Sequence, residues 1–237
     1  MQFIKKVQLE KKYIAFGRFY ILKYDNGEKR CCRSILEIFE RNSCDSLKDT
    51  NKIDAVFIMM NPGSGKPLKA YKHQCQNINQ VKDGEVVKIQ LVETDPDDTQ
   101  YQIMRVMRIM KWKYVRVINL SDYRNPESKS FYTMIKESIS YDSEVIHSIF
   151  SKGRTQEIDN VFKSDDNFKV ITAWGVNTKL RKLIKLALEN NNLNRRIGNN
   201  KTSYKRRKDF YYYHPLPRNP LEQPLWLEEM LGRLENK

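Results

Sequence analysis

The sequence lacks the features of a membrane-spanning, secreted or repetitive protein. Its longest uninterrupted apolar run, Ala55 to Met60, is far too short to cross a bilayer. Glycine and proline, with 9 and 8 residues, are too scarce for a collagenous or low-complexity chain. The first residues, Met1 to Lys6, include no apolar stretch typical of a signal peptide. We therefore expect a cytoplasmic protein without a membrane partner.

Cysteine is also scarce, and its spacing predicts neither disulfides nor a metal site. The four cysteines are Cys31, Cys32, Cys44 and Cys75, and no two of them form a C-x-x-C pair. Adjacent cysteines rarely bridge, because the geometry of a disulfide is hard to meet between neighbours. His73 and Cys75 would supply only half of a zinc site, and no second pair follows. We expect free thiols in a reducing compartment and no bound metal.

Motifs for nucleotide cofactors are incomplete as well. The segment Gly63-Ser64-Gly65-Lys66 resembles the end of a phosphate-binding loop. However, Met60 stands where that loop requires its first glycine, and Pro67 replaces its serine or threonine. The sequence shows no sign of a flavin or nicotinamide requirement, no Ser-His-Asp spacing and no paired-carboxylate motif. We therefore expect no cofactor.

Positive charge is what the chain has in excess. It carries 43 lysine and arginine residues against 29 aspartate and glutamate residues, a formal net charge of +14. A segment between residues 195 and 208 contains no acid and holds one aromatic residue, Tyr204. Its basic residues are Arg195, Arg196, Lys201, Lys205, Arg206, Arg207 and Lys208. Such a segment favours a nucleic-acid partner, with DNA as the first expectation. The alternative is a solvated, flexible loop.

The hydrophobic pattern predicts a single α/β domain over residues 1–237. Apolar runs at 53–60, 114–120 and 168–174 are typical of buried parallel strands, and residues 210–213 are a candidate fourth strand. Helical patterns lie between and after them, at 99–112, 131–150, 177–188 and 225–234. We expect a three-layer sandwich around a central, mainly parallel, four-stranded sheet. An N-terminal β-hairpin within residues 1–45 and an insertion at residues 73–98, with a strand-like run at 86–92, complete the prediction.

The candidate site residues lie at the end of each predicted strand, and the carboxyl ends of the strands are where parallel sheets bind ligands. They are Asn61, Pro62, Gly63 and Ser64 after the first strand, Asn119 after the second, Trp174 and Gly175 after the third, and His214 after the fourth. Ordinary structural roles would also explain them: turn chemistry for Asn61, satisfied backbone groups for Asn119, and the end of a strand for His214. Residues 95–99 are typical of a helix start, capped by Asp98 or Thr99.

In their order and combination these motifs resemble the uracil-DNA glycosylase superfamily. The matching motifs are Met60-Asn61-Pro62-Gly63, Val117-Ile118-Asn119, Ala173-Trp174-Gly175 and His214-Pro215-Leu216-Pro217. A bacterial and phage family known as domain of unknown function number sixteen forty-three is still more similar, through its Asn-Pro-Ser, Asp-Pro-Thr, Asn-Leu, Trp-Gly and His-Pro-Leu motifs. The resemblance covers residues 53–217. Gly63 departs from that family's serine, and the stretch at 95–99 lengthens its Asp-Pro-Thr.

The resemblance implies a DNA N-glycosylase that removes a uracil-like or modified base after flipping it into a pocket at the strand ends. Asn61 would orient the water that attacks the sugar carbon, and His214 would stabilise negative charge on the departing base. Asn119 would hydrogen-bond the edge of the base. The remaining predicted substrate contacts are Pro62, Gly63, Ser64, Trp174 and Gly175, with Tyr71 or Tyr123 stacking on the base.

Three other functions remain open at this point. A non-catalytic nucleic-acid-binding module would depend on the basic segment and not on Asn61 or His214. A hydrolase or binder of small nucleotides would use the same pocket without a polymer and with little salt dependence. A phage or defence interaction protein would have only a vestigial pocket.

Overall fold

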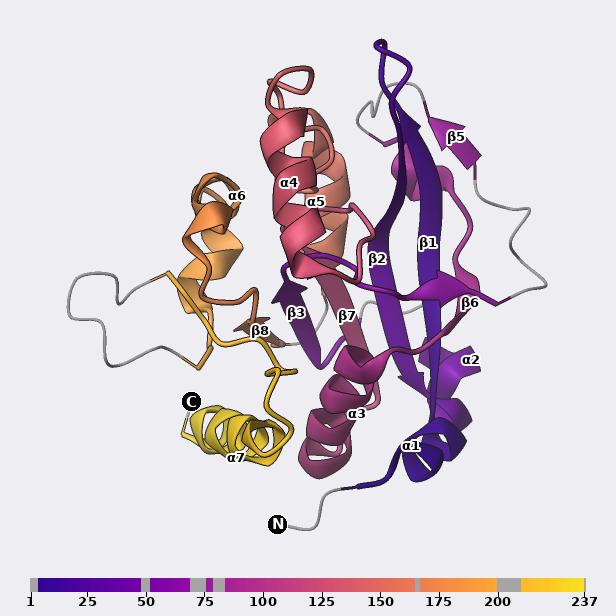
Figure 1. Ribbon diagram of the computed structural model, residues 1–237. Helices are drawn as coiled ribbons and strands as arrows, with labels where there is room; N and C mark the ends of the chain where they lie inside the picture. The colour runs from indigo at the N-terminus through magenta and orange to yellow at the C-terminus, as the bar shows by residue number, and fades with distance from the viewer. Residues whose placement is uncertain are drawn as a thin grey trace.

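The computed structural model describes residues 4–47, 52–68, 76–78, 84–164, 167–199 and 210–236. Within these residues eight strands form one open, mixed sheet in the order β4–β6–β1–β2–β7–β3–β8, with β5 beside β1 (Figure 1). The strands are β1 (Tyr13–Lys23), β2 (Lys29–Glu40), β3 (Ala55–Met59), β4 (Lys66–Pro67), β5 (Gln76–Ile78), β6 (Val92–Asp95), β7 (Tyr114–Asn119) and β8 (Lys169–Thr172). The helices are α1 (Lys6–Lys12), α2 (Cys44–Leu47), α3 (Asp98–Met110), α4 (Ser128–Ser138), α5 (Thr155–Phe162), α6 (Arg181–Leu188) and α7 (Glu222–Glu235).

Strands β7, β3 and β8 are neighbours that run parallel, and at the other side of the sheet the short β5 runs parallel to β1. All residues of β3 and β7 are buried, because helices cover both faces, and β3 is therefore apolar throughout instead of alternating. The α/β class and the strands expected near 53–60, 114–120 and 168–174 are confirmed. The register pairs Met59 with Asn119, so the polar residues that follow β3 and β7 lie side by side.

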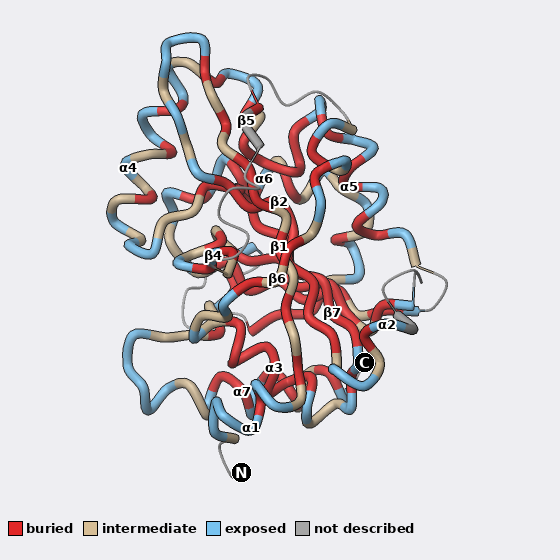
Figure 2. Tube along the Cα trace, turned by 90° about the vertical axis from the view of Figure 1, so that its right-hand side faces the viewer, coloured by how far each residue is buried: buried red, intermediate tan, exposed pale blue. Residues whose placement is uncertain are grey.

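Two hydrophobic clusters lie on opposite faces of the sheet. One joins the sheet to α4, α5 and α6, and the other joins it to α1, α3 and α7. Figure 2 shows buried residues running along the strands, whereas exposed residues gather on the outer sides of helices such as α4. The described helices are all too short or too polar to cross a membrane.

The expected fourth parallel strand is not formed. Residues 210–213 make one isolated bridge, between Tyr212 and Gly175, and no continuous ladder. The Trp174 indole nitrogen donates a hydrogen bond to the Phe210 carbonyl at 2.8 Å, which ties this segment to the end of β8. The segment therefore still carries His214 to the edge of the sheet where β3 and β7 end.

The N-terminal hairpin is confirmed, and it extends the main sheet. Strands β1 and β2 pair from Tyr13 with Glu40 to Lys23 with Lys29, and β2 continues the sheet by pairing with β7. The turn contains Gly27, whose φ of 84° suits a residue without a Cβ. A β-bulge interrupts the hairpin where Gly17 pairs with Leu36 but Phe19 pairs with Arg33.

Two of the other expected elements differ from the structure. The strand expected at 86–92 is a 3-10 turn, Val86–Lys88, and β6 begins only at Val92, where it pairs with β1 and β4. The helix expected over 131–150 ends at Ser138. Downstream, the Asp142 carboxylate accepts the backbone N–H of Ile146 at 2.9 Å, so a side chain takes the place of a helical carbonyl.

Candidate functional site

A pocket of about 510 Å³ lies at the carboxyl ends of the parallel strands. That volume is in the range of small-ligand sites. Four loop segments form its wall, after β3, β7 and β8 and around His214, and the start of α3 closes another side. Of the predicted site residues, those lining it are Asn61, Pro62, Gly63, Asn119, Trp174, Gly175 and His214.

Asn119 is fully buried at the end of β7, with 0% of its surface exposed. Neither its side-chain nitrogen nor its side-chain oxygen has a hydrogen-bond partner within the described residues. A buried amide without partners costs free energy, and polar groups of this kind are normally satisfied. Asn119 lines the pocket, so its side-chain N–H donor and its carbonyl acceptor are available to a molecule bound there.

Asn61 is held in one orientation by the loop that follows β7. Its amide nitrogen donates to the carbonyl of Asn125 at 2.7 Å and to the carbonyl of Tyr123 at 3.3 Å. Two carbonyl partners identify this atom as the nitrogen, so the amide oxygen is the atom left to accept a hydrogen bond. The side chain can therefore orient a water molecule in the pocket.

His214 is a neutral imidazole with a fixed tautomer. Burial lowers the pKa of His214 from 6.5 to about 4. The Leu216 N–H donates to its Nδ1 at 3.2 Å, so Nδ1 is the acceptor and the proton resides on Nε2. His214 therefore brings a neutral N–H donor to the pocket, able to stabilise negative charge that develops on a ligand.

Sequence reasoning missed several polar residues of this pocket, among them Arg33, Gln100 and Asp97. Arg33 on β2 and Gln100 in the first turn of α3 are each 2% exposed, and both have side-chain atoms without partners among the described residues. Asp97 is the N-cap of α3, where Asp98 or Thr99 was expected, and its Oδ1 accepts the N–H groups of Thr99 and Gln100. Burial raises the pKa of Asp97, although the nearby charge of Arg33 opposes the shift.

The aromatic residues at the pocket differ from those expected. Tyr123 is fully buried and stacks on His147 at 4.3 Å between ring centroids, so the prediction that it stacks on a base is wrong. Tyr71 lies outside the described residues. The aromatic residues lining the pocket are Trp174, Tyr132 and Tyr213.

The remaining residues that were predicted to contact a substrate or nucleic acid do not line the pocket or lie outside the described residues. Ser64 is exposed and does not line it. Arg195 stacks on the Phe168 ring at 4.2 Å, and Arg196 donates to the Tyr212 hydroxyl at 2.7 Å. These two arginines therefore already contact the body of the protein. The other five predicted basic contacts, Lys201, Lys205, Arg206, Arg207 and Lys208, lie outside the described residues.

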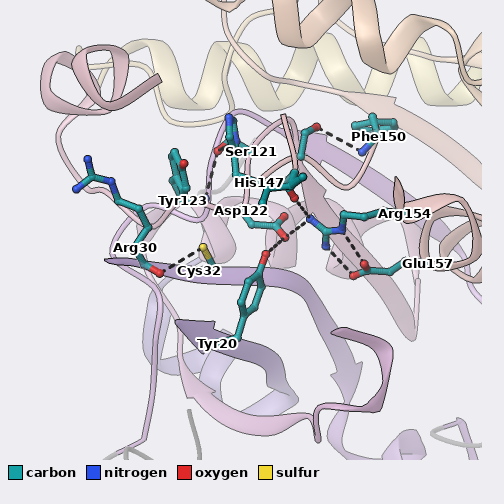
Figure 3. A network of polar contacts seen from close by, with 12 residues as sticks. Tyr20, Arg30, Cys32, Ser121, Asp122, Tyr123, His147, Phe150, Arg154 and Glu157 are labelled. Atoms are coloured by element: carbon teal, nitrogen blue, oxygen red, sulfur yellow. Dashed lines mark hydrogen bonds and ion pairs between the residues drawn. The ribbon is translucent and has the colours of Figure 1, made fainter. Parts of the chain in front are cut away.

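A buried ionic network fixes the loop after β7 (Figure 3). Arg154 forms an ion pair with Asp122 at 2.7 Å and two hydrogen bonds of 2.8 Å with Glu157, and the Tyr20 hydroxyl donates to Asp122 at 2.7 Å. The Asp122 carbonyl accepts the backbone N–H of Arg33 at 2.9 Å. Desolvation raises the pKa of Asp122 to about 6, although Arg154 opposes the shift. The network therefore holds β2 and the loop in the positions that shape the pocket.

Beside this network, Ser121, His147 and Asp142 lie in a row that resembles a catalytic triad. The Ser121 hydroxyl is 2.9 Å from His147 Nδ1, and His147 Nε2 is 3.9 Å from Asp142. All three side chains are buried, and none of them lines the pocket. A substrate cannot reach the hydroxyl, so the row is structural.

The reaction at the pocket is not indicated by a group of metal ligands among the described residues or by similarity to known proteins. The described residues contain no group of three His, Cys, Asp or Glu side chains placed to hold a metal ion. Among the described residues, Cys31 and Cys32 are free cysteines. Comparison of the chain with protein-family models, curated proteins and solved structures gave no match.

Proposed function

We propose that the chain is a DNA N-glycosylase that removes a uracil-like or modified base from a nucleotide flipped into the pocket. The observation that carries the proposal is Asn119, whose buried donor and acceptor both lack partners in the described chain. The edge of a nucleobase offers an acceptor and a donor side by side, which is the complement of an amide. The pocket volume of about 510 Å³ leaves room for a base with its sugar.

The arrangement of the strands supports a uracil-DNA-glycosylase-like architecture. Strands β7, β3 and β8 are parallel, and helices cover both faces of the sheet. Ile197 makes a parallel bridge with Ile171 of β8, at the place of a fourth parallel strand. In this proposal the four-stranded core is reduced to three strands and a bridge, and the hairpin β1–β2 extends it on the other side.

The proposed reaction is hydrolysis of the bond between the sugar C1′ and the base nitrogen. As that bond breaks, its electron pair goes to the base, and the His214 Nε2–H donates to the base oxygen on which charge develops. The amide oxygen of Asn61 orients a water molecule, whose oxygen forms the new bond to C1′. The departing base then takes a proton from solvent, which yields a free base and an abasic sugar.

Asp97 is the group proposed to accept the proton that the water loses. It is the carboxylate among the described residues that line the pocket, and burial raises its pKa toward the range of a working base. Its Oδ1 caps α3, so Oδ2 is the oxygen that remains. A Cβ built on Gly63 would lie 3.1 Å from Oδ2, which puts this oxygen beside the loop that carries Asn61.

A panel of labelled oligonucleotides tests the proposal. Single- and double-stranded DNAs carrying uracil, hypoxanthine, methylated or hydroxymethylated bases are incubated with the protein, and abasic sites are detected as alkali-labile breaks. We expect breaks with the wild type and none with Asn61→Ala/His214→Ala. Binding without breaks on every substrate would contradict the glycosylase and favour a binding module, and activity on free nucleotides alone would favour a nucleotide hydrolase.

A further inference from the structure

Arg33 is a buried cation whose side chain makes no hydrogen bond or ion pair within the described chain. It is 2% exposed, and both Nε and Nη1 lack partners. Burial lowers the pKa of Arg33 to about 10, so the guanidinium is still protonated at neutral pH. The carboxylate of Asp97 acts on it through space, but the two form no ion pair. Buried charges are normally paired, and within the part of the chain that the structure describes Arg33 forms no ion pair.

The β-bulge is what turns Arg33 toward the pocket. Leu36 packs on the face of the sheet that α3 covers, and strict alternation would direct Arg33 to the opposite face, beside Ile35. Because two residues of β2 oppose one residue of β1 at the bulge, the alternation shifts by one position. Arg33 consequently lines the same pocket as Gln100 of α3.

Gln100 lies beside the Arg33 guanidinium, and both residues line the pocket. Both polar atoms of the Gln100 side chain are buried and without partners among the described residues. A Cβ on Gly65 would collide with Arg33 Nη1 and lie 2.9 Å from Gln100 Nε2, so both nitrogens lie against this glycine and close to one another. Because Arg33 and Gln100 also line the pocket, they offer N–H groups and a positive charge to one ligand there.

We infer that Arg33 and Gln100 bind the phosphate of the nucleotide whose base contacts Asn119. This inference rests on the proposed function, because it takes the ligand to be a nucleotide. The charged residues lining the pocket are Arg33, Arg218 and Asp97, and His214 is neutral, so the wall carries a net positive charge. The backbone N–H of Arg33 donates to the carbonyl of Asp122, which lies three residues after Asn119. Because Arg33 belongs to β2 and Asn119 to β7, and these strands are paired, the proposed phosphate and base sites lie on neighbouring strands.

Binding is measured by quenching of tryptophan fluorescence, which Trp174 in the pocket wall supplies. The probes are deoxynucleoside 5′-monophosphates, the matching deoxynucleosides, inorganic phosphate at constant ionic strength, and a short single-stranded oligonucleotide. The variants are Arg33→Met and Gln100→Leu. Arg108→Met on the exposed part of α3 is the control, because it removes the same charge outside the pocket. Thermal unfolding shows that each variant is folded.

We expect the wild type to bind the monophosphate more tightly than the nucleoside, and Arg33→Met to weaken monophosphate binding by about 10- to 100-fold with little change for the nucleoside. If Arg33→Met weakens binding of the oligonucleotide but not of the monophosphate, the phosphate belongs to a polymer. If it weakens binding of both probes, the site accepts the phosphate of a free nucleotide and of a polymer. Equal binding of nucleoside and monophosphate by wild type and Arg33→Met would overturn the phosphate site but leave the base pocket. Binding of inorganic phosphate that needs Arg33, without any nucleoside or nucleotide binding, would retain an anion site and overturn the proposed function.

Discussion

Replacing Asn119 with leucine should stabilise the protein and abolish its function. Leucine has nearly the shape of asparagine but no polar atoms, and Val117 and Ile103 offer apolar neighbours in the pocket. A buried polar group without a partner costs about 1–3 kcal/mol. The unfolding free energy should therefore rise by about 1–3 kcal/mol in Asn119→Leu, equivalent to roughly 2–4 °C in Tm for each kcal/mol in a chain of this size.

The comparison residue is Asn199, which is equally buried and donates to the Trp226 carbonyl at 3.0 Å, whereas its side-chain oxygen has no partner within the described residues. Asn199→Leu removes one hydrogen bond, worth about 1 kcal/mol, together with one unpartnered oxygen, so the two effects oppose each other and the unfolding free energy should rise less than in Asn119→Leu. Urea unfolding of both variants at pH 7 makes the comparison. An unfolding free energy that falls in Asn119→Leu, or that rises no more than in Asn199→Leu, would refute the reasoning, because it would show that Asn119 has a structural role.

Three further predictions concern catalysis, acid stability and salt. Asp97→Asn keeps a good N-cap but removes a base, so the rate of base release should fall about 10²- to 10⁴-fold with Tm nearly unchanged; an unaltered rate would contradict the proposed role. The folded-state pKa of His147 is about 3 and that of His214 about 4, below the unfolded value of 6.5. The unfolded chain therefore binds protons first, and the unfolding free energy should fall by about 1.4 kcal/mol per histidine for each pH unit between about pH 6 and the folded-state pKa of that histidine. Asp122, with its pKa raised to about 6, offsets part of this fall between pH 4 and 6, and a flat stability profile from urea unfolding would refute the assignment. The logarithm of the DNA binding constant should decrease linearly with the logarithm of salt concentration, and that of the nucleoside binding constant should not; equal slopes would exclude phosphate contacts.

The strands that build the site were predictable because each is buried on both faces. Strand β3 and most of β7 are therefore continuous apolar runs, and the turn residues after them mark the strand ends. Asn61 and Asn119 follow from that pattern together with the rule that ligands bind at the carboxyl ends of parallel strands. His214 was expected after a fourth strand that is not formed, and it reaches the pocket from a segment tied to the end of β8 by the bridge between Tyr212 and Gly175.

The other side of the pocket depends on pairings that no local pattern reveals. Arg33 reaches the pocket only through a bulge between β1 and β2, and a period-two pattern would direct it elsewhere. Gln100 lies in the first turn of α3, where a polar residue indicates solvent unless the packing of that helix is known. The helix expected to continue past Ser138 was wrong because Asp142 competes for backbone hydrogen bonds.

The most direct test of the central claim is mass spectrometry of the free base released from DNA containing uracil, hypoxanthine, and methylated and hydroxymethylated cytosine. Wild type and Asn119→Leu are compared at equal concentration, with Tm confirming that both are folded. The account predicts that the wild type releases one of these bases and that the more stable Asn119→Leu releases none. Equal release by both proteins, or no release by the wild type from any of these DNAs, would contradict it.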